Sequence, residues 1–264
     1  MRHNRMTVAD LRAAKGKRPL SMLYVETVEE AAAAAAAGVD ILSIIAPVWT
    51  PEMREAAGDC FVQVGLLYGE LITAEDYLRA AFAARKAGGD AYYCAAALTT
   101  VAALAAEGLP VVGHVGLVPS KTTWTGGFRA VGKDAASAAK VWSDMVALEA
   151  AGAFACELEV VPARLGAELS RRSGLVTFGM GAGGGADAQY LFAEDVLGYT
   201  RGHRPRHAKS YRNFAAEYER LQLERVSAFR EFVADVRNGV YPETRHDVAM
   251  DEAEFETFKA ALGR

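Results

Sequence analysis

The sequence predicts a closed (β/α)8 barrel, an α/β fold. Short apolar runs alternate with longer amphipathic, alanine-rich stretches, and most of the runs follow a Gly-Val-Asp or Gly-Gly-Asp type of turn. The runs are apolar throughout rather than alternating, as is typical of parallel strands that are covered on both faces. Seven or eight such units in 264 residues favour closure. A doubly wound open sheet is the alternative, because the order of strands and helices alone does not distinguish the two folds.

Seven segments are predicted as strands, and an eighth has a weaker pattern. The seven are Leu20–Val25, Ile41–Ile45, Phe61–Leu67, Ala91–Ala95, Pro110–His114, Ala155–Val160 and Val176–Met180, and the eighth is Tyr190–Phe192. Helices are predicted between them, including Val28–Ala37, Ala74–Ala87, Ala135–Ala150 and Ala163–Ser173. We interpret residues 1–264 as one barrel domain with a C-terminal helical extension over about 212–264. Within it, 212–238 predicts a long charged helix, either a solvated cap or an oligomer contact.

Composition narrows the classes of function. The chain is 52% apolar and 23% charged, as in ordinary globular proteins, which excludes collagen-like and disordered chains. Its net charge of −4 includes no long run of one sign, so nucleic acid is not an expected partner. The longest nearly uncharged stretch, Ala91–Ala106, is shorter than the ~18 residues of a membrane span, and no secretory signal is evident, so a cytoplasmic protein is predicted. Cys60, Cys94 and Cys156 lack zinc or disulfide spacing and are expected to be reduced, buried thiols.

The predicted carboxyl ends of the strands carry few polar side chains, and catalytic groups of such barrels lie at that end. Glu157 and Glu159 are two residues apart and therefore share one face of the sixth strand. The other candidate site residues lie at or near the ends of the first, fourth and fifth strands: Tyr24, Glu26, Tyr93 and His114. We expect these side chains to meet at one end of the barrel and to bind a small molecule.

Several motifs in order resemble ketopantoate hydroxymethyltransferases. They include Gly113–Pro119, Thr125–Phe128, Leu148–Ala155, Leu158–Ala163 and Gly179–Gly183, followed by the shorter segments Asp187–Gln189, Asp195–Gly198 and Lys209–Tyr211. The opening Thr7–Leu11 and Ala37–Asp40 fit the same family. The resemblance thus extends over about residues 6–247 and is carried by many motifs rather than one.

The resemblance implies a (β/α)8 barrel related to phosphoenolpyruvate mutase and isocitrate lyase, assembled as a homo-oligomer. Members of the family transfer a one-carbon unit from methylenetetrahydrofolate to a branched 2-oxo acid. They bind Mg²⁺ through acidic residues at the ends of strands two, three and four, and the cation stabilises the enolate that forms when a base removes a proton. Glu159 matches the family's general base and His114 its histidine on strand five.

This chain departs from the family at the metal site. The family's carboxylate after strand two aligns with Ala46, that of strand three with Val64, and the Lys-Leu-Glu of strand four with Tyr93–Ala95. Hydrocarbon side chains supply no oxygen ligands to a hard cation. These departures predict that Mg²⁺ binding is lost, and the resemblance leaves methylenetetrahydrofolate open as a co-substrate.

Glu157 stands where the family has an apolar residue, and its role has several interpretations. Two carboxylates on one strand face share a proton or pair with a cation. A further hypothesis is that Glu26, His114, Glu157 and Glu159 form a site for a softer metal such as Zn²⁺ or Fe²⁺. Tyr24 and Tyr93 either donate hydrogen bonds to an oxyanion in place of the metal or simply fill the core.

The loops supply weaker signals. Lys121 and Arg129 follow strand five and could meet a substrate carboxylate, and Trp124 lies in a stretch long enough to act as a lid. The glycines of Gly179–Gly184 match a dinucleotide fingerprint formally, but after the seventh strand, so close backbone approach is the simpler interpretation.

Two functions remain open at this point. The first is an enzyme that forms an enolate, or makes or breaks a C–C bond, on a small 2-oxo acid or related carbonyl compound, with an altered substrate or without a metal. The second is a catalytically inactive homologue that binds a metabolite or acts as a regulatory subunit.

Overall fold

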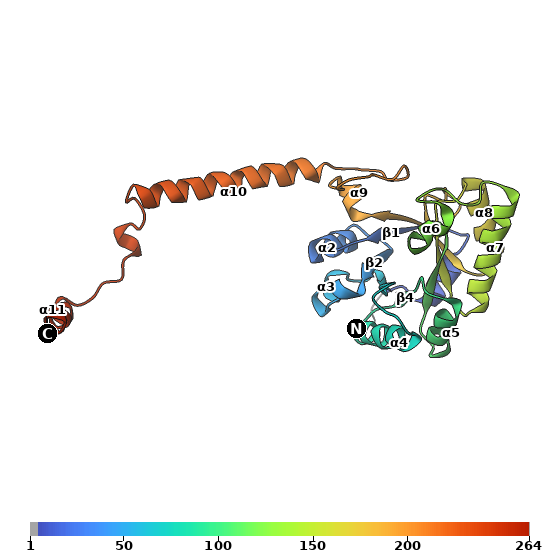
Figure 1. Ribbon diagram of the computed structural model, residues 1–264, viewed down its shortest axis with the longest axis horizontal. Helices are drawn as coiled ribbons and strands as arrows, with labels where there is room; N and C mark the ends of the chain where they lie inside the picture. The colour runs from blue at the N-terminus through green and yellow to red at the C-terminus, as the bar shows by residue number, and fades with distance from the viewer. Residues whose placement is uncertain (1–4, 264) are drawn as a thin grey trace. The chain divides into compact units, whose positions relative to one another are not determined.

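Eight parallel strands close into a barrel in the computed structural model, which describes residues 5–263 (Figure 1). Their order is that of the sequence, and β8 pairs with β1. The strands are β1 (Leu20–Tyr24), β2 (Ile41–Ile45), β3 (Phe61–Gly65), β4 (Ala91–Tyr93), β5 (Val111–Gly116), β6 (Ala155–Glu159), β7 (Val176–Met180) and β8 (Ala188–Phe192). The predicted barrel is confirmed, the open sheet is wrong, and the weak eighth strand is present.

Helices follow most strands and surround the barrel (Figure 1). They are α1 (Val8–Ala14), α2 (Val28–Ala36), α3 (Pro51–Ala56), α4 (Ala74–Lys86), α5 (Leu98–Ala106), α6 (Thr122–Thr125), α7 (Ala135–Ala150), α8 (Ala163–Arg172) and α9 (Ala193–Leu197). The side chains of Thr27, Thr73 and Asp134 accept hydrogen bonds from the first turns of α2, α4 and α7. These caps fix where each helix starts, because they satisfy backbone N–H groups that the helix itself leaves unpaired.

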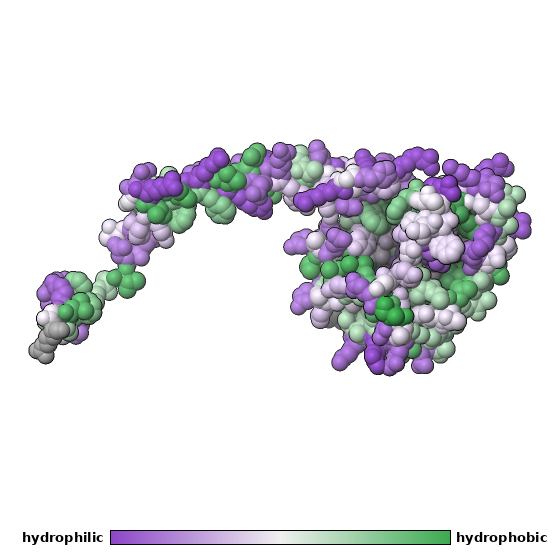
Figure 2. Space-filling model, viewed as in Figure 1, coloured by the Kyte–Doolittle hydropathy of each residue, from purple (hydrophilic) through white to green (hydrophobic). Residues whose placement is uncertain are grey.

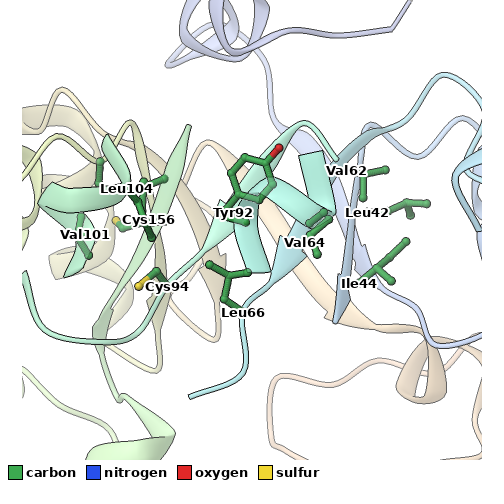
Figure 3. Close-up of a cluster of buried hydrophobic side chains, with 14 of the residues drawn as sticks. Leu42, Ile44, Val62, Val64, Leu66, Tyr92, Cys94, Val101, Leu104 and Cys156 are labelled. Atoms are coloured by element: carbon green, nitrogen blue, oxygen red, sulfur yellow. The ribbon is translucent and has the colours of Figure 1, made fainter. Parts of the chain in front are cut away.

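The two faces of the barrel wall have different roles. Leu42, Ile44, Val62, Val64 and their neighbours face the helices and form the larger apolar core (Figure 3). The alternate residues point inward, and those near the strand starts form an apolar plug that includes Met22, Ile41, Phe61, Val112 and Phe178. Towards the carboxyl ends of the strands, several of the inward side chains are polar instead. The two ends of the barrel interior therefore differ in their side-chain chemistry.

A buried polar cluster lies at the opposite, amino-terminal ends of β7 and β8, against Ser170 of α8. The carboxylate of Asp187 forms an ion pair of 2.8 Å with Lys15 and also accepts hydrogen bonds from the backbone N–H groups of Gly16 and Thr177. The Thr177 hydroxyl donates a further bond of 2.9 Å to the same carboxylate. Each oxygen of this buried anion has a partner, and one partner is a cation.

The chain divides into two units, Met1–Arg212 and Asn213–Arg264. The second unit contains α10 (Phe214–Arg237), which begins after an Asn213 cap, and α11 (Glu252–Leu262), and neither helix has a buried residue. Apolar side chains of α10, including Leu223, Phe229 and Phe232, are exposed. Hydrophobic patches are visible along this helix in Figure 2. The choice between a solvated cap and an oligomer contact stays open.

Two further expectations can be compared with the described residues. Cys60, Cys94 and Cys156 are all buried and none is in a disulfide, as expected. No helix within residues 5–263 is long and apolar enough to cross a membrane.

Candidate active site

A cavity of about 1000 Å³ opens at the carboxyl ends of the strands. All six predicted site residues line it: Tyr24, Glu26, Tyr93, His114, Glu157 and Glu159. The strand register explains this, because His114 pairs with Glu157 and Gly116 with Glu159 across β5 and β6. The structure thus brings the predicted residues together, while their catalytic and binding roles stay predictions.

His114 is the centre of the site. Its Nδ1 lies 2.7 Å from the hydroxyl of Tyr93, and its Nε2 lies 3.1 Å from Oε2 of Glu159. Burial, together with the charges of Glu157 and Glu159, raises the pKa of Tyr93 well above its usual value, so this hydroxyl keeps its proton. In the imidazole tautomer that carries its proton on Nε2, Nδ1 accepts the hydrogen bond from this hydroxyl. This Nε2 is buried and lacks a hydrogen bond, because Glu159 is close but not in line with it.

Glu157 lies one layer deeper, on the same face of β6 as Glu159. One of its oxygens accepts a hydrogen bond of 2.7 Å from the amide of Gln63, and the other lies 3.6 Å from Nδ1 of His114. Burial raises the pKa of Glu157 to about 7, although His114 and Gln63 oppose the shift. Gln63 also donates to Ser43, while its own carbonyl oxygen has no partner. The floor of the cavity therefore holds a carboxyl group that can carry a proton near neutral pH.

The two tyrosines that were predicted as oxyanion donors or core residues have distinct environments. The Tyr93 hydroxyl contacts His114, whereas the Tyr24 hydroxyl donates a bond of 2.9 Å to Glu26. The ring of Tyr24 also packs against Phe192 at 4.8 Å between centroids. Tyr93 thus acts on the buried cluster, and Tyr24 belongs to the edge of the cavity.

The residues present do not fit the Mg²⁺ site that the resemblance implies. Ala46 and Ala95 offer no side-chain oxygen, and the assignment of Val64 to the strand-three position needs correction. Val64 packs outward among the helices (Figure 3), because inward and outward side chains alternate along a strand. The inward residue is Gly65, which lines the cavity and also lacks a side-chain oxygen.

The hypothesis of a softer metal is not supported either. Within residues 5–263 no group of three or more His, Cys, Asp and Glu side chains is arranged to hold a metal ion. Glu26 is engaged with Tyr24 at the edge of the cavity, while Glu157 is engaged with Gln63 on its floor. The proposed ligands share one cavity but do not converge on one point.

Several lining residues were missed by sequence reasoning. Ser43 and Tyr190 point inward from strands, and counting alternate residues along β2 and β8 would have found them. Glu30, Glu194, Asp195, Tyr199, His203 and His207 come from α2, α9 and the following segment. No periodic signal marks these residues, since they are placed by helix starts and irregular backbone.

The loop candidates are largely outside the cavity. Lys121 and Arg129 are exposed and do not line it, and Trp124 is 89% exposed, whereas Phe128 of the same segment does line it. Gly181 has a φ of +65°, and a side chain there would lie 2.8 Å from His207. The glycines after β7 therefore permit close packing, in agreement with the simpler interpretation.

The fold and the site together define a (β/α)8 barrel with a buried acid–histidine cluster at the carboxyl ends of its strands. The sequence model of ketopantoate hydroxymethyltransferase matches residues 54–244, and the chain belongs to this family. It is 36% identical over 167 residues to a 3-methyl-2-oxobutanoate hydroxymethyltransferase of Nitratidesulfovibrio vulgaris, covering 63% of this chain and 52% of that protein. It is 42% identical over 146 residues to one of Frankia casuarinae, covering 55% and 47%. The chain spans about half the length of these curated relatives.

Solved structures support the same barrel type. A putative phosphonomutase from Burkholderia cenocepacia J2315 superposes with a TM-score of 0.54 at 16% identity, covering 85% of this chain and 99% of that one. Phosphonopyruvate hydrolase, in a complex with oxalate and Mg²⁺, gives 0.50 at 13% identity, covering 98% and 99%. At these identities the likeness concerns the fold, and it agrees with the predicted relation to phosphoenolpyruvate mutase-type barrels.

Proposed function

We propose that this chain is a ketopantoate hydroxymethyltransferase-like enzyme that abstracts a proton beside a carbonyl group without the family's divalent cation. One observation carries the proposal: the buried Nε2 of His114, a residue that lines a large cavity, has no hydrogen bond and lies beside Glu159. A buried donor without a partner is costly, so its retention is best explained by a ligand that completes it.

The chemistry uses two groups on adjacent strands. The Glu159 carboxylate takes a proton from the carbon next to the substrate carbonyl, and the C–H electron pair moves onto the carbonyl oxygen to give an enolate. The N–H of His114 donates to that oxygen, as a neutral imidazole does in other barrels that enolise carbonyl compounds. The enolate carbon would then attack the carbon of a one-carbon C=N electrophile, whose π electrons move onto nitrogen as the C–C bond forms. The family uses methylenetetrahydrofolate as the source of this electrophile.

Tyr93 positions His114 rather than touching the substrate. Its hydroxyl donates to Nδ1, which keeps the imidazole proton on Nε2, where the developing oxyanion needs it. This support replaces part of the charge stabilisation that a cation provides in the family. The altered carboxylate positions Ala46, Gly65 and Ala95 support a metal-independent route.

Proton–deuterium exchange tests the proposal most simply. Wild-type protein in deuterated buffer with a chelator is mixed with small carbonyl compounds, including 3-methyl-2-oxobutanoate and neutral ketones, and loss of the α-proton signal is followed by NMR. We expect at least one compound to exchange, and Glu159→Gln to slow that exchange by at least ~100-fold. Glu107→Gln is the control, because it removes one negative charge at the surface just as Glu159→Gln removes one in the site. This variant should catalyse the exchange at the wild-type rate.

A negative result would favour the other hypothesis. If no compound exchanges although one of them raises the melting temperature, the chain binds a metabolite without transforming it. If Glu159→Gln exchanges as fast as the wild type, Glu159 is not the base.

We further propose that the enzyme works in the cytoplasm and as a homo-oligomer. Its buried cysteines are all unpaired, as is usual in reducing compartments, and α10 exposes apolar side chains. Light scattering during size-exclusion chromatography should give a mass above the 28.2 kDa of one chain. A monomer mass would contradict the oligomer.

A further inference from the structure

The cavity has an unbalanced set of charges. Its lining includes six carboxylates, Glu26, Glu30, Glu157, Glu159, Glu194 and Asp195, and three histidines, His114, His203 and His207. The same lining contains no arginine or lysine. None of these six carboxylates pairs with an arginine or lysine in the described part of the chain. A negatively charged substrate would enter this space against repulsion, with only histidines to offset it.

Four of the carboxylates form a rim that is distinct from the buried cluster: Glu26, Glu30, Glu194 and Asp195. Neutral groups hold two of them in place. Tyr24 donates to Glu26, and the backbone N–H of Glu26 donates to Glu30 at 3.0 Å. The hydroxyl of Tyr199 also donates to Glu30. These bonds orient the carboxylates without neutralising them.

The rim carboxylates influence one another. The pKa of Glu194 is raised, first by partial burial and then by the charges of Asp195, Glu26 and Glu30. The pKa of Tyr24 is raised by burial, by its bond to Glu26, and by Glu194 and Glu30. Both shifts report a negative potential at this edge, and a bound cation would relieve it.

Aromatic rings line the same edge. Tyr24 packs beside Phe192, and Phe192 lies 5.9 Å from Tyr190 between ring centroids, while Tyr199 and Phe128 complete the lining. Carboxylates combined with aromatic faces are the usual surroundings of an alkylammonium group, which the rings attract through their negative faces. An anionic ligand gains nothing from either kind of group.

The other end of such a ligand is placed by a separate observation. His114 lines the cavity, its side chain is 2% exposed, and its buried Nε2 has no hydrogen bond. A carbonyl oxygen is the acceptor that would complete this donor. The cavity thus offers a donor for a carbonyl on its floor and a negative, aromatic surface for a cation at its rim.

We propose that the substrate is a carbonyl compound bearing an alkylammonium group, bound with the carbonyl at His114 and the ammonium at the Glu26–Glu30–Glu194 rim. This assignment of substrate class rests on the proposed function for the position of the carbonyl. It differs from the 2-oxo acids of the family, whose carboxylate would find no arginine or lysine among the lining residues.

Three matched ketones test the proposal by binding alone. They are (4-oxopentyl)trimethylammonium, its neutral isostere 6,6-dimethylheptan-2-one, and the anion 5-oxohexanoate. The quaternary nitrogen cannot form an imine and so reports charge and shape only. Isothermal titration calorimetry with wild-type protein should show the cation binding at least about tenfold more tightly than the neutral ketone, and the anion more weakly than both.

Rim variants locate the effect. In Glu30→Gln/Glu194→Gln the preference for the cation over the neutral ketone should fall at least about fivefold, while the affinity for the neutral ketone stays the same. Glutamine keeps the shape of the side chain, and at residue 30 its carbonyl oxygen still accepts the bond from the backbone N–H of Glu26 while its amide donates to the Tyr199 hydroxyl. The melting temperature of the variant, compared with that of the wild type, checks that folding is preserved. The control is Glu107→Gln, which removes one charge from an exposed residue outside the cavity and should leave the preference unchanged.

The possible results separate this proposal from the proposed function. Equal or tighter binding of the anion, or a preference that the rim variants leave unchanged, overturns the substrate class even if ketones exchange their α-protons. A rim-dependent preference for the cation supports the substrate class, and it does so even if no ketone exchanges, in which case the enzymatic proposal alone fails.

Discussion

The two ends of the barrel each bury a carboxylate cluster, but the clusters differ in how their charges are met. At the amino-terminal end, Asp187 has a lysine 2.8 Å away and hydrogen bonds from backbone and hydroxyl groups. At the carboxyl end, Glu157 and Glu159 have neither lysine nor arginine beside them: Glu157 accepts from the Gln63 amide, both carboxylates lie near His114, and Gln63 Oε1 and His114 Nε2 lack hydrogen-bond partners. Hydrogen bonds and ion pairs that satisfy every buried polar atom stabilise the fold, whereas buried polar atoms without a partner can bind a ligand.

The difference also appears in the acidity of the buried groups. Burial raises the pKa of Glu157 to about 7, since no full cation compensates it. A buried carboxyl group that titrates near neutral pH at the mouth of a barrel is typical of a functional site rather than of a structural ion pair. We therefore infer that the amino-terminal cluster stabilises the fold and that the carboxyl-end cluster carries out the chemistry. Four substitutions test this inference.

The largest expected effect on stability comes from the amino-terminal cluster. Lys15→Met leaves the 4% exposed Asp187 side chain without its cation and should lower the free energy of unfolding by about 3 kcal/mol. Urea denaturation followed by circular dichroism measures this. The exchange activity per folded molecule should not change, and a loss of activity with unchanged stability would reverse the assignment of the two ends.

A pH-dependent effect of similar size is expected at the other end. Glu157 has a folded pKa of about 7 against an ordinary value of 4.5, so the folded state holds a proton that the unfolded state has released between these pH values. The free energy of unfolding should then decrease as pH rises through this window, by about 3 kcal/mol in total. Below this pH window Glu157 is protonated in both the folded and the unfolded state, so it does not lower the free energy of unfolding.

Glu157→Gln removes this titration. The free energy of unfolding of the variant, compared with that of the wild type, should be higher at about pH 8 than at about pH 5. Urea denaturation of both proteins at both pH values measures this difference. Parallel pH profiles for the two proteins would show that Glu157 is ionised in the folded state throughout.

Tyr93→Phe is expected to act on the rate rather than on stability. Without the hydroxyl, Nδ1 of His114 no longer accepts a hydrogen bond from residue 93. The imidazole proton is then distributed between the two ring nitrogens. The maximal exchange rate should fall about 10- to 100-fold, with little change in KM, because the lost interaction supports the oxyanion. An increase in KM with an unchanged maximal rate would instead place Tyr93 in substrate binding.

The smallest effect is expected for Tyr24→Phe. This change removes one hydroxyl donor to Glu26 and should alter affinity for the cationic ketone by less than about fivefold. The maximal exchange rate should stay the same. A large decrease in that rate would restore Tyr24 as an oxyanion donor, one of the two roles predicted from the sequence.

Much of the fold follows from the sequence because its signals are local. Continuous apolar runs and alanine-rich helices predicted the barrel, and the two-residue period placed Glu157 and Glu159 on one inner face. The same period, misjudged by one residue on β3, assigned a site position to Val64 instead of Gly65. A shift of one residue turns a side chain to the other face of the wall.

The rest of the site depends on contacts that no local pattern records. Gln63 is a polar residue inside an apolar run, and only its 2.7 Å bond to Glu157 from the far side of the barrel shows its role. His207 and Glu194 follow the last strand and reach the cavity through irregular backbone and a short helix. Their positions come from tertiary structure rather than from periodicity.

The central claim is that the carboxyl-end cluster forms an enolate without a metal cation. The most direct test compares the α-proton exchange rate of metal-free wild-type protein in chelator with the rate in excess Mg²⁺, using the ketone that exchanges fastest. We expect the two rates to agree within about twofold, because no step draws on Lewis-acid stabilisation. Exchange that is absent in chelator and restored by Mg²⁺ would contradict the account.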